Sequence, residues 1–161
     1  MEFAIDTADR LNITDHELSE LLTQVYVSGG FVKPAEATAL FDPSAVRNRG
    51  LLIGARDEPT SNLAGVVILV PPESPARRVA QGNEVEMHLL GVKEEYRRRG
   101  LGRLLVEAAV SRAKNCNYPK MVLVTQLSME SAHKLYETTG FAHVNDIQRN
   151  GRDFRVYELA L

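Results

Sequence analysis

Two glycines and three arginines lie close together in the segment Arg97–Gly102, which reads Arg-Arg-Arg-Gly-Leu-Gly. It stands between a strand-like apolar run and a helix-like pattern. Glycines let a ligand approach the backbone closely, and the first amides of a helix have no partner within the helix. The helix dipole adds partial positive charge there, and guanidinium groups bind phosphate well. We therefore predict a phosphate-binding turn; the alternative is a solvated basic turn whose glycines serve only to start the helix.

Other phosphate-binding patterns fit this turn less well. A dinucleotide fingerprint needs a third small residue where Leu105 stands, and a P-loop needs Gly-Lys-Ser/Thr, which the chain lacks. The arginines have no interleaved aromatic residues on which bases could stack. A formal net charge of -2 gives no general attraction to nucleic acid or to an anionic membrane. We expect neither partner.

Three further side chains could move protons. Glu86 and His88 lie two residues apart on a strand-like run and so share one face. A carboxylate or an imidazole there could accept a proton, or both could simply line a cleft or an exposed face. Tyr136 continues the helical spacing of Met129 and Ala132, which by itself is typical of a core aromatic residue.

Metal chemistry and disulfides are not expected. The four histidines form no close-spaced ligand set, so we predict no metal. The single cysteine, Cys116, excludes an internal disulfide and fits a reducing compartment. The longest apolar run, Leu63 to Val70, is too short to span a bilayer, and the N-terminus does not resemble a signal peptide. We expect a cytoplasmic protein.

The periodicity predicts the elements that must position these groups. A capping box at Thr14–Glu17 starts a helix, and a second helix after Pro34 is interrupted at Asp42-Pro43. Two more helices are predicted from Gly100 to about Asn115 and over Ser128–Thr139. Strands are predicted over residues 2–5, 51–55, 63–70, 84–92 and 121–125, followed by a hairpin around Asn150-Gly151.

This order predicts an α/β fold of one domain. The chain has 161 residues, 44% of them hydrophobic and 25% charged, which suits a single globular unit. Strand, helix, strand, helix and a closing hairpin indicate a mixed sheet with a parallel pair at its middle.

Two motifs, in order, resemble the GNAT superfamily of acetyl-CoA-dependent N-acetyltransferases. Arg97-x-x-Gly100-x-Gly102 resembles its pyrophosphate-binding signature, and Ala132-x-x-Leu135-Tyr136-x-x-x-Gly140-Phe141 resembles its second signature. The clear resemblance covers about residues 84–141. It implies a GNAT-like mixed, mostly antiparallel sheet with a splayed central parallel strand pair, flanked by helices, in a single domain over residues 1–161.

The resemblance also implies a reaction. An acetyl group would move from acetyl-CoA, the acyl-donor co-substrate, to a primary amine by direct attack through a tetrahedral intermediate. The acceptor would be a small-molecule or peptide amine, and a homodimer stays open. Because fold does not fix function, the alternative is a non-catalytic acyl-CoA-binding or regulatory module on the same fold.

Roles for individual residues follow from the same resemblance. Glu86 would be the general base, with His88 as the alternative, and Tyr136 would protonate the coenzyme A thiolate. Gly91 interrupts the strand and marks either a bulge or a close approach of another backbone. At a bulge, Leu90 and Val92 would align pantetheine, with the Leu90 amide near the thioester carbonyl. The pyrophosphate would lie on the turn, whose residues are Arg97, Arg98, Arg99, Gly100, Leu101 and Gly102.

Other positions around this site are less defined by the motifs. Arg103 and Lys134 could reach cofactor phosphates or be solvated helix charges. Met129 stands where the family often has an asparagine that contacts the cofactor, so that contact is in doubt. Substrate selection is expected from residues 26–32, the loop 71–83 and the hairpin around Asn150, where Asp146, Asp153 or Glu84 could hold a cationic acceptor.

Overall fold

The computed structural model describes residues 2–161. The strands are β1 (Phe3–Thr7), β2 (Leu51–Asp57), β3 (Leu63–Val70), β4 (Val85–Val92), β5 (Lys120–Gln126), β6 (Ala142–Arg149) and β7 (Arg152–Ala160). The α-helices are α1 (Asp15–Leu22), α2 (Pro34–Leu40), α3 (Pro43–Asn48), α4 (Leu101–Asn115) and α5 (Glu130–Thr138). A π-helical turn, η1 (Thr23–Ser28), extends α1, and a 3-10 turn, η2 (Glu94–Tyr96), follows β4.

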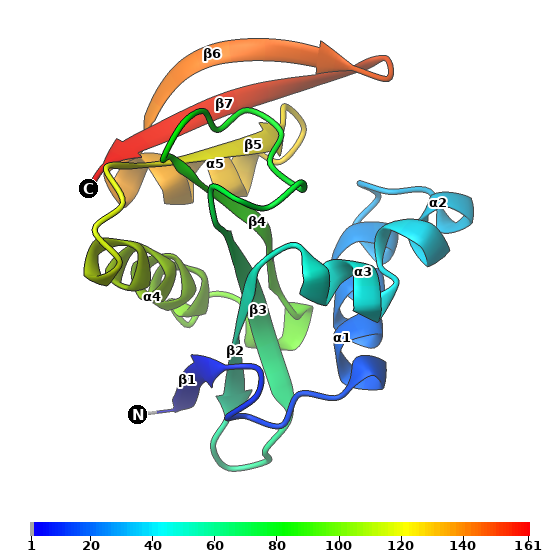
Figure 1. Ribbon diagram of the computed structural model, residues 1–161. Helices are drawn as coiled ribbons and strands as arrows, with labels where there is room; N and C mark the ends of the chain where they lie inside the picture. The colour runs from blue at the N-terminus through cyan, green and yellow to red at the C-terminus, as the bar shows by residue number, and fades with distance from the viewer. Residues whose placement is uncertain (1) are drawn as a thin grey trace.

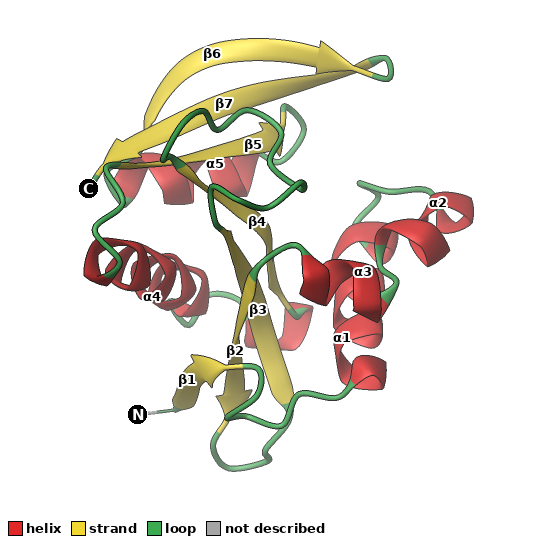
Figure 2. Ribbon diagram, in the orientation of Figure 1, coloured by secondary structure: helices red, strands yellow, loops and turns green. Residues whose placement is uncertain are grey.

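The strands form one mixed sheet in the order β1-β2-β3-β4-β5-β7-β6. All neighbouring pairs are antiparallel except β4 and β5, which run parallel. Figure 1 and Figure 2 show β4 and β5 diverging at the middle of the molecule, between a lower group of strands and the long β6–β7 hairpin. The predicted mixed sheet with a central parallel pair is confirmed.

Helices cover both faces of this sheet (Figure 1). On one face α4 and α5 pack over a core that includes Val85, Met87, Met121 and Leu123. On the other face α1 and its neighbours cover a second core that includes Val66 and Ile68. Because successive side chains of a strand alternate between faces, Glu86 and His88 point to the α1 side of β4.

Local sequence signals explain where several elements begin. The Thr14 hydroxyl accepts a hydrogen bond from the Glu17 amide, and the Glu17 carboxylate accepts one from the Thr14 amide, as the predicted capping box requires. Pro34 and Pro43 occupy the first turns of α2 and α3, where proline removes no needed donor. Asn150 and Gly151, with φ of 51° and 74°, make the tight turn between β6 and β7.

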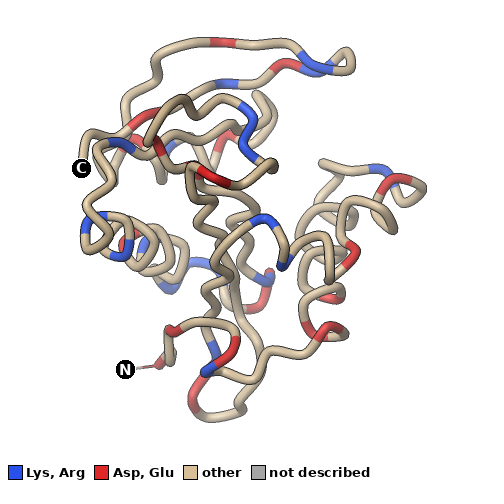
Figure 3. Tube along the Cα trace, in the orientation of Figure 1, with Lys and Arg blue, Asp and Glu red and all other residues tan. Residues whose placement is uncertain are grey.

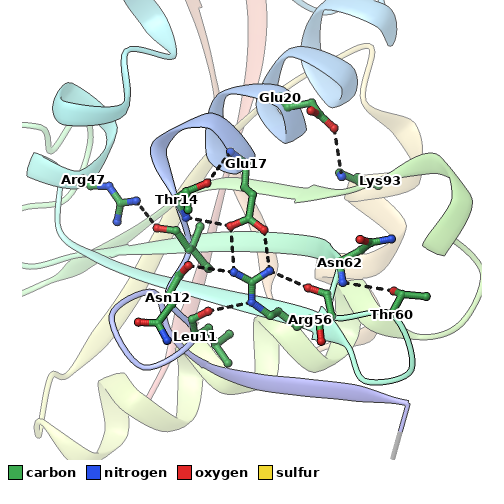
Figure 4. A network of polar contacts seen from close by, with 12 residues as sticks. Leu11, Asn12, Thr14, Glu17, Glu20, Arg47, Arg56, Thr60, Asn62 and Lys93 are labelled. Carbon is green, nitrogen blue, oxygen red and sulfur yellow. Dashed lines mark hydrogen bonds and ion pairs between the residues drawn. The ribbon is translucent and has the colours of Figure 1, made fainter.

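An arginine fixes α1 to the sheet (Figure 4). All five N–H groups of Arg56, on β2, have partners. Two bind the Glu17 carboxylate at 2.8 and 2.9 Å, and the others bind carbonyls of Leu11, Asn12 and Ser61. This network holds the pKa of Glu17 at about 2, chiefly through the hydrogen bond from Arg56. The start of α1 is therefore anchored on the sheet that carries Glu86 and His88.

No helix within residues 2–161 is both long enough and apolar enough to cross a membrane.

Candidate functional site

The parallel pairing of β4 with β5 is short. It covers only Val85–Met87 on β4 and residues 121–123 on β5, and the strands separate beyond that point. The register of β3 with β4 also shifts, because Leu89 and Leu90 together face the single residue Val67. The carbonyl of Leu90 accepts the Tyr26 hydroxyl at 3.0 Å. The predicted splay is confirmed, and it leaves Leu90–Val92 without a strand partner on the β5 side.

The bulge in β4 lies at Leu89 and Leu90, before the predicted position at Gly91. Leu89, with φ of 50°, holds the left-handed conformation, whereas Gly91 has no positive φ. A Cβ on Gly91 would lie 3.4 Å from side-chain atoms of Leu21 and Val25, so the glycine lets α1 and η1 pack closely on β4. The expectation that Gly91 marks the bulge is therefore corrected: a leucine adopts the strained backbone, at a cost of about 1–2 kcal/mol.

The predicted phosphate-binding turn leads directly into α4. Gly100 is the N-cap residue with φ of 76°, and no side chain caps the helix. The amides of Leu101, Gly102 and Arg103 therefore have no partner within the helix. Figure 3 shows the basic stretch that leads into α4. Added at Gly102, a Cβ would lie 3.0 Å from Leu135 Cδ2, so this glycine also lets α4 and α5 approach closely. The backbone thus presents unpaired amides at the start of α4, as an anion site would require.

The arginines of the turn differ in what they contact. Arg97 Nε donates to the Val92 carbonyl at 3.1 Å, which ties the turn to the end of β4. Arg99 lies over the Tyr96 ring and 3.6 Å from Glu2. Arg103 lies 3.9 Å from Glu107 along α4. Arg98 and Lys134 are exposed. The backbone amides, with Arg98, are thus the least engaged donors at the turn.

Tyr136 lies on α5 with its ring buried against Phe141 and Tyr157, each with its ring centroid 5.9 Å away. The Tyr136 hydroxyl makes no hydrogen bond to residues 2–161. In that range every side-chain nitrogen or oxygen that is fully enclosed has a hydrogen-bond partner, so this hydroxyl is not fully enclosed. The hydroxyl oxygen therefore keeps a small exposed area, although Tyr136 as a whole is only 6% exposed. Burial, with smaller contributions from Tyr26 and Tyr157, raises the pKa of Tyr136, so the phenol stays protonated near neutral pH. Met129 lies at the N-terminus of the same helix, with Thr125 Oγ1 3.7 Å from its sulfur.

Glu86 and His88 form a buried pair. Glu86 is fully buried, and its carboxylate accepts hydrogen bonds from the amides of Arg78, Val79 and Ala80 at 2.9–3.0 Å. Its second oxygen also contacts His88 Nε2. Burial by itself would raise the pKa of Glu86, but the bonds from His88, Val79 and Ala80 outweigh it and lower the pKa to about 2. A carboxylate this well satisfied is a weak proton acceptor.

The partners of His88 define its tautomer. A carboxylate can only accept, so Nε2 carries the hydrogen toward Glu86. Arg49 Nη1, which can only donate, lies 3.4 Å from Nδ1, so Nδ1 carries a lone pair rather than a hydrogen and faces the guanidinium at a distance too long for a strong hydrogen bond. Burial lowers the pKa of His88, Glu86 opposes this, and the charges of Arg78 and Arg49 lower it further. The net result is a neutral ring. The geometry thus favours His88 as proton acceptor, with Glu86 orienting it.

The three segments expected to select the substrate do meet. The Phe31 carbonyl accepts hydrogen bonds from Gln126 and Arg152, both at 3.0 Å, so the segment 26–32 contacts the ends of β5 and β7. Arg149, beside the hairpin turn, donates to the Arg78 carbonyl at 3.1 Å. The loop 71–83 in turn binds Glu86. These segments form a continuous rim on the α1 side of β4 and β5.

The three acidic residues expected to hold a cationic acceptor all have partners. Asp146 lies 2.6 Å from His143 Nε2, and Asp153 accepts from Gln148 at 3.2 Å. Glu84 accepts the Gln81 amide at 3.1 Å and lies 3.8 Å from Lys120. Within residues 2–161 no group of three or more His, Cys, Asp or Glu side chains is arranged to hold a metal ion.

A family model described as "Acetyltransferase (GNAT) family" matches residues 16–141. The chain belongs to the GNAT acetyltransferase family. Its match therefore reaches well beyond the two motifs, into α1 and the strands before β4.

Curated relatives match part of this GNAT chain. N-acetyltransferase family 8 member 3 of Rattus norvegicus is 30% identical over 84 residues, covering 52% of this chain and 36% of that protein. Mycothiol acetyltransferase of Jonesia denitrificans is 38% identical over 71 residues, covering 42% of this chain and 23% of that protein. The chain thus spans well under half the length of these two relatives.

Solved structures match nearly the whole GNAT fold. A GNAT family acetyltransferase of Elizabethkingia anophelis, with acetyl-CoA bound, has a TM-score of 0.70 and 20% identity, with 99% of each chain covered. An acetyltransferase of the GNAT family from Staphylococcus aureus has a TM-score of 0.76 and 18% identity, with 98% of each chain covered. At this identity the likeness establishes the fold.

Sequence reasoning missed Arg49, and it placed Tyr26 only within the substrate-selecting segment 26–32 without its contact to β4. Tyr26 and Arg49 reach Leu90 and His88 from elements that are 64 and 39 residues distant along the chain. No motif marks either residue. Only the packing of η1 and of the α3–β2 junction against β4 brings them to the site.

Proposed function

We propose that this protein is an acetyl-CoA-dependent N-acetyltransferase that acetylates a primary amine by direct transfer, as a single domain. One observation carries the proposal: the pairing of β4 with β5 ends at Met87, so the edge at Leu90–Val92 has no β5 partner, and the chain leads from that edge through the turn to the unpaired amides at the start of α4. Acetyl-CoA would supply the activated acetyl group as a thioester.

The donor side uses backbone groups and two kinds of side chain. The amides of residues 101–103 and the Arg98 guanidinium would bind the pyrophosphate, with Arg97 holding the turn against β4. Leu90 and Val92 would pair with the pantetheine amides, and the Leu90 amide would stabilise negative charge on the thioester oxygen. The Tyr136 phenol would donate its proton to the departing sulfur, which suits a hydroxyl kept protonated by burial.

The acceptor side uses the buried His88–Glu86 pair. An alkyl amine has a pKa near 10.4 and arrives protonated at neutral pH, so it must lose a proton before it can attack. His88 Nδ1 would take that proton, and the Glu86 carboxylate would orient the ring and stabilise the imidazolium that forms. Glu86 then acts as a positioning residue rather than as the base itself.

Relatives support the reaction class and leave the acceptor open. Their names include N-acetylaspartate synthetase, mycothiol acetyltransferase and N-alpha-acetyltransferase 30. A solved structure of 18% identity, the NatC complex, was determined with a Gag peptide and CoA. Small amines and peptide N-termini are therefore both represented among proteins that resemble this chain.

The test is release of the coenzyme A thiol from acetyl-CoA on addition of amines. We expect amine-dependent thiol release and an acetylated product of matching mass. Tyr136→Phe should lower kcat while leaving the acetyl-CoA dissociation constant within about twofold. Binding of acetyl-CoA without transfer to any amine would instead favour a non-catalytic acyl-CoA-binding module.

A further inference from the structure

Arg49 is a half-buried cation with few partners. It follows α3, and its guanidinium contacts only His88 Nδ1 and the Leu40 carbonyl, both at 3.4 Å. Both distances are long for hydrogen bonds. Of its five N–H donors, three make no hydrogen bond to residues 2–161. No carboxylate in that range lies within 4 Å of it.

Four other partly buried arginines, Arg47, Arg56, Arg152 and Arg155, lie within 4 Å of a carboxylate, whereas Arg77 binds the Gly82 carbonyl alone. Arg47, two residues before Arg49, donates to Asp15 at 2.9 Å and to the Ile13 carbonyl at 2.6 Å. Arg56 binds both oxygens of Glu17, and Arg152 lies 3.6 Å from Glu36. Removing a cation from water without a counter-charge is unfavourable. Arg49 and Arg77 are thus the two partly buried arginines with no carboxylate within 4 Å among residues 2–161, and of these two Arg49 contacts His88, so its remaining donors can bind an anionic group beside that ring.

A second cation strengthens the positive field at this place. The charge of Arg78, on the loop that wraps Glu86, lowers the pKa of both Arg49 and His88. The one acidic group nearby, Glu86, is already bound to three amides and His88. Tyr26, the remaining polar neighbour, is held in its neutral form because burial raises its pKa. The surroundings of His88 Nδ1 are therefore positively charged and favour an anionic group on the acceptor substrate.

The spacing narrows the kind of anion. Arg49 Nη1 and His88 Nδ1 are 3.4 Å apart, so an amine at Nδ1 and an anionic group on the guanidinium must be close neighbours in one molecule. In an α-amino acid a single carbon joins the amine to a planar carboxylate, which matches the paired donors of a guanidinium. A longer amine with a remote acid, or a polyamine, does not place both groups there.

We propose that the acceptor is an α-amino acid or a close analogue, with its carboxylate bound by Arg49 and its amine at His88 Nδ1. This inference rests on the proposed function, since it assigns the acceptor of that same site. Arg78 contributes to the field, and Arg49 provides the direct contact.

The proposal is tested with pairs of acceptors, each an amino acid and the amine that lacks its α-carboxylate. Thiol release from acetyl-CoA is measured with leucine against 3-methylbutylamine and with phenylalanine against 2-phenylethylamine, so each pair differs only in the α-carboxylate. Glutamate against 4-aminobutyrate adds a pair in which a remote acid remains. In the pair with the highest activity, we expect kcat/KM to be about tenfold or more higher for the amino acid than for the amine. A factor of this size corresponds to the free energy of a hydrogen bond to a charged group.

Variants assign the preference to Arg49. Arg49→Gln should reduce the ratio of kcat/KM between the amino acid and the amine of that pair to about twofold or less. Arg49→Lys should retain part of this ratio because the charge remains. Arg47→Gln is the matched control, since it removes the same charge from the same helix but from a side chain paired with Asp15, and it should keep the full ratio.

Several results overturn the inference: equal or better use of the decarboxylated amines, a preference that survives Arg49→Gln, or acetylation of polyamines or peptides only. Calorimetry with acetyl-CoA distinguishes failure of the acceptor assignment from failure of the proposed function. Acetyl-CoA binding without acetylation of any α-amino acid overturns the acceptor class alone, whereas absence of acetyl-CoA binding overturns both.

Discussion

Replacing Glu86 with glutamine should weaken both the fold and the reaction, for reasons visible in its contacts. The carboxylate accepts hydrogen bonds from the Arg78, Val79 and Ala80 amides and from His88. Glutamine keeps one accepting oxygen, but its amide nitrogen can only donate, so the bonds lose their charge and one oxygen site is lost. Charge-assisted bonds exceed neutral ones by about 1 kcal/mol each, so we expect a loss of about 2–3 kcal/mol in the free energy of unfolding.

The pH dependence gives this loss a signature. The folded-state pKa of Glu86, about 2, lies below its ordinary value of 4.5. A depressed carboxyl pKa adds stability that is complete above the unfolded value and is lost as the pH falls through the folded value. Glutamine does not titrate there. The gap between wild type and Glu86→Gln should therefore be full at pH 7 and should narrow as the pH drops below about 4.5.

The assay is urea unfolding of both proteins at pH 7 and pH 3, alongside thermal melts. At this chain length about 2–3 kcal/mol corresponds to a fall in Tm of roughly 4–12 °C. Glu84→Gln is the control, because this neighbouring carboxylate accepts one amide at 3.1 Å and lies at 3.8 Å from a partly exposed lysine. Its loss should stay below about 1 kcal/mol. Wild-type stability in Glu86→Gln at pH 7, or a gap unchanged at pH 3, would refute this reasoning.

The same substitution should change catalysis through the tautomer of His88. The glutamine amide would donate to Nε2, which then gives up its hydrogen, and Nδ1 would carry the proton instead. A protonated Nδ1 cannot accept a proton from the acceptor amine. We expect kcat to fall by about 10²–10⁴-fold, the usual contribution of a positioned base, with acetyl-CoA binding retained. An unchanged kcat would remove the pair from the mechanism.

Three further predictions concern separate elements. Tyr136→Phe should lower kcat by at least about tenfold with little change in stability, because its hydroxyl has no partner within residues 2–161; steady-state kinetics with melts decides. Gly100→Ala should lower the free energy of unfolding by about 1 kcal/mol, since φ there is 76° with no crowding, and should weaken acetyl-CoA binding in calorimetry. Arg56→Gln should cost about 2–3 kcal/mol in urea unfolding, because Glu17 loses its counter-charge and keeps only the Thr14 amide while three carbonyls lose their guanidinium donor. Replacement of exposed Arg10, Arg10→Gln, should change stability by less than about 0.5 kcal/mol.

The elements could be predicted because each carries a local signal. Thr14 with Glu17 caps α1, Pro34 and Pro43 start α2 and α3, and Asn150-Gly151 turns the hairpin. Such signals depend on neighbours in sequence, so they survive without knowledge of the tertiary structure. The splay of β4 from β5 was expected only through the family resemblance.

The site was predicted in part, since its remaining contacts are long-range. A glycine in a strand indicates a bulge at Gly91, whereas the register shift and the left-handed conformation fall at Leu89, where no residue type signals them. The role of Glu86 depends on amides of the loop 78–80, whose approach no periodicity encodes. Arg49 reaches His88 across 39 residues, so its missing counter-charge is visible only in the fold.

Thermal unfolding with and without acetyl-CoA tests the central claim most directly, namely that acetyl-CoA binds where β4 and β5 separate. At about 100 times the dissociation constant, binding to the folded state alone adds about 2.7 kcal/mol. At this chain length, that raises Tm by roughly 5–10 °C. We predict that rise with acetyl-CoA, its absence with ATP or NAD, and a smaller rise in Gly100→Ala. No rise with acetyl-CoA at millimolar concentration would contradict the account.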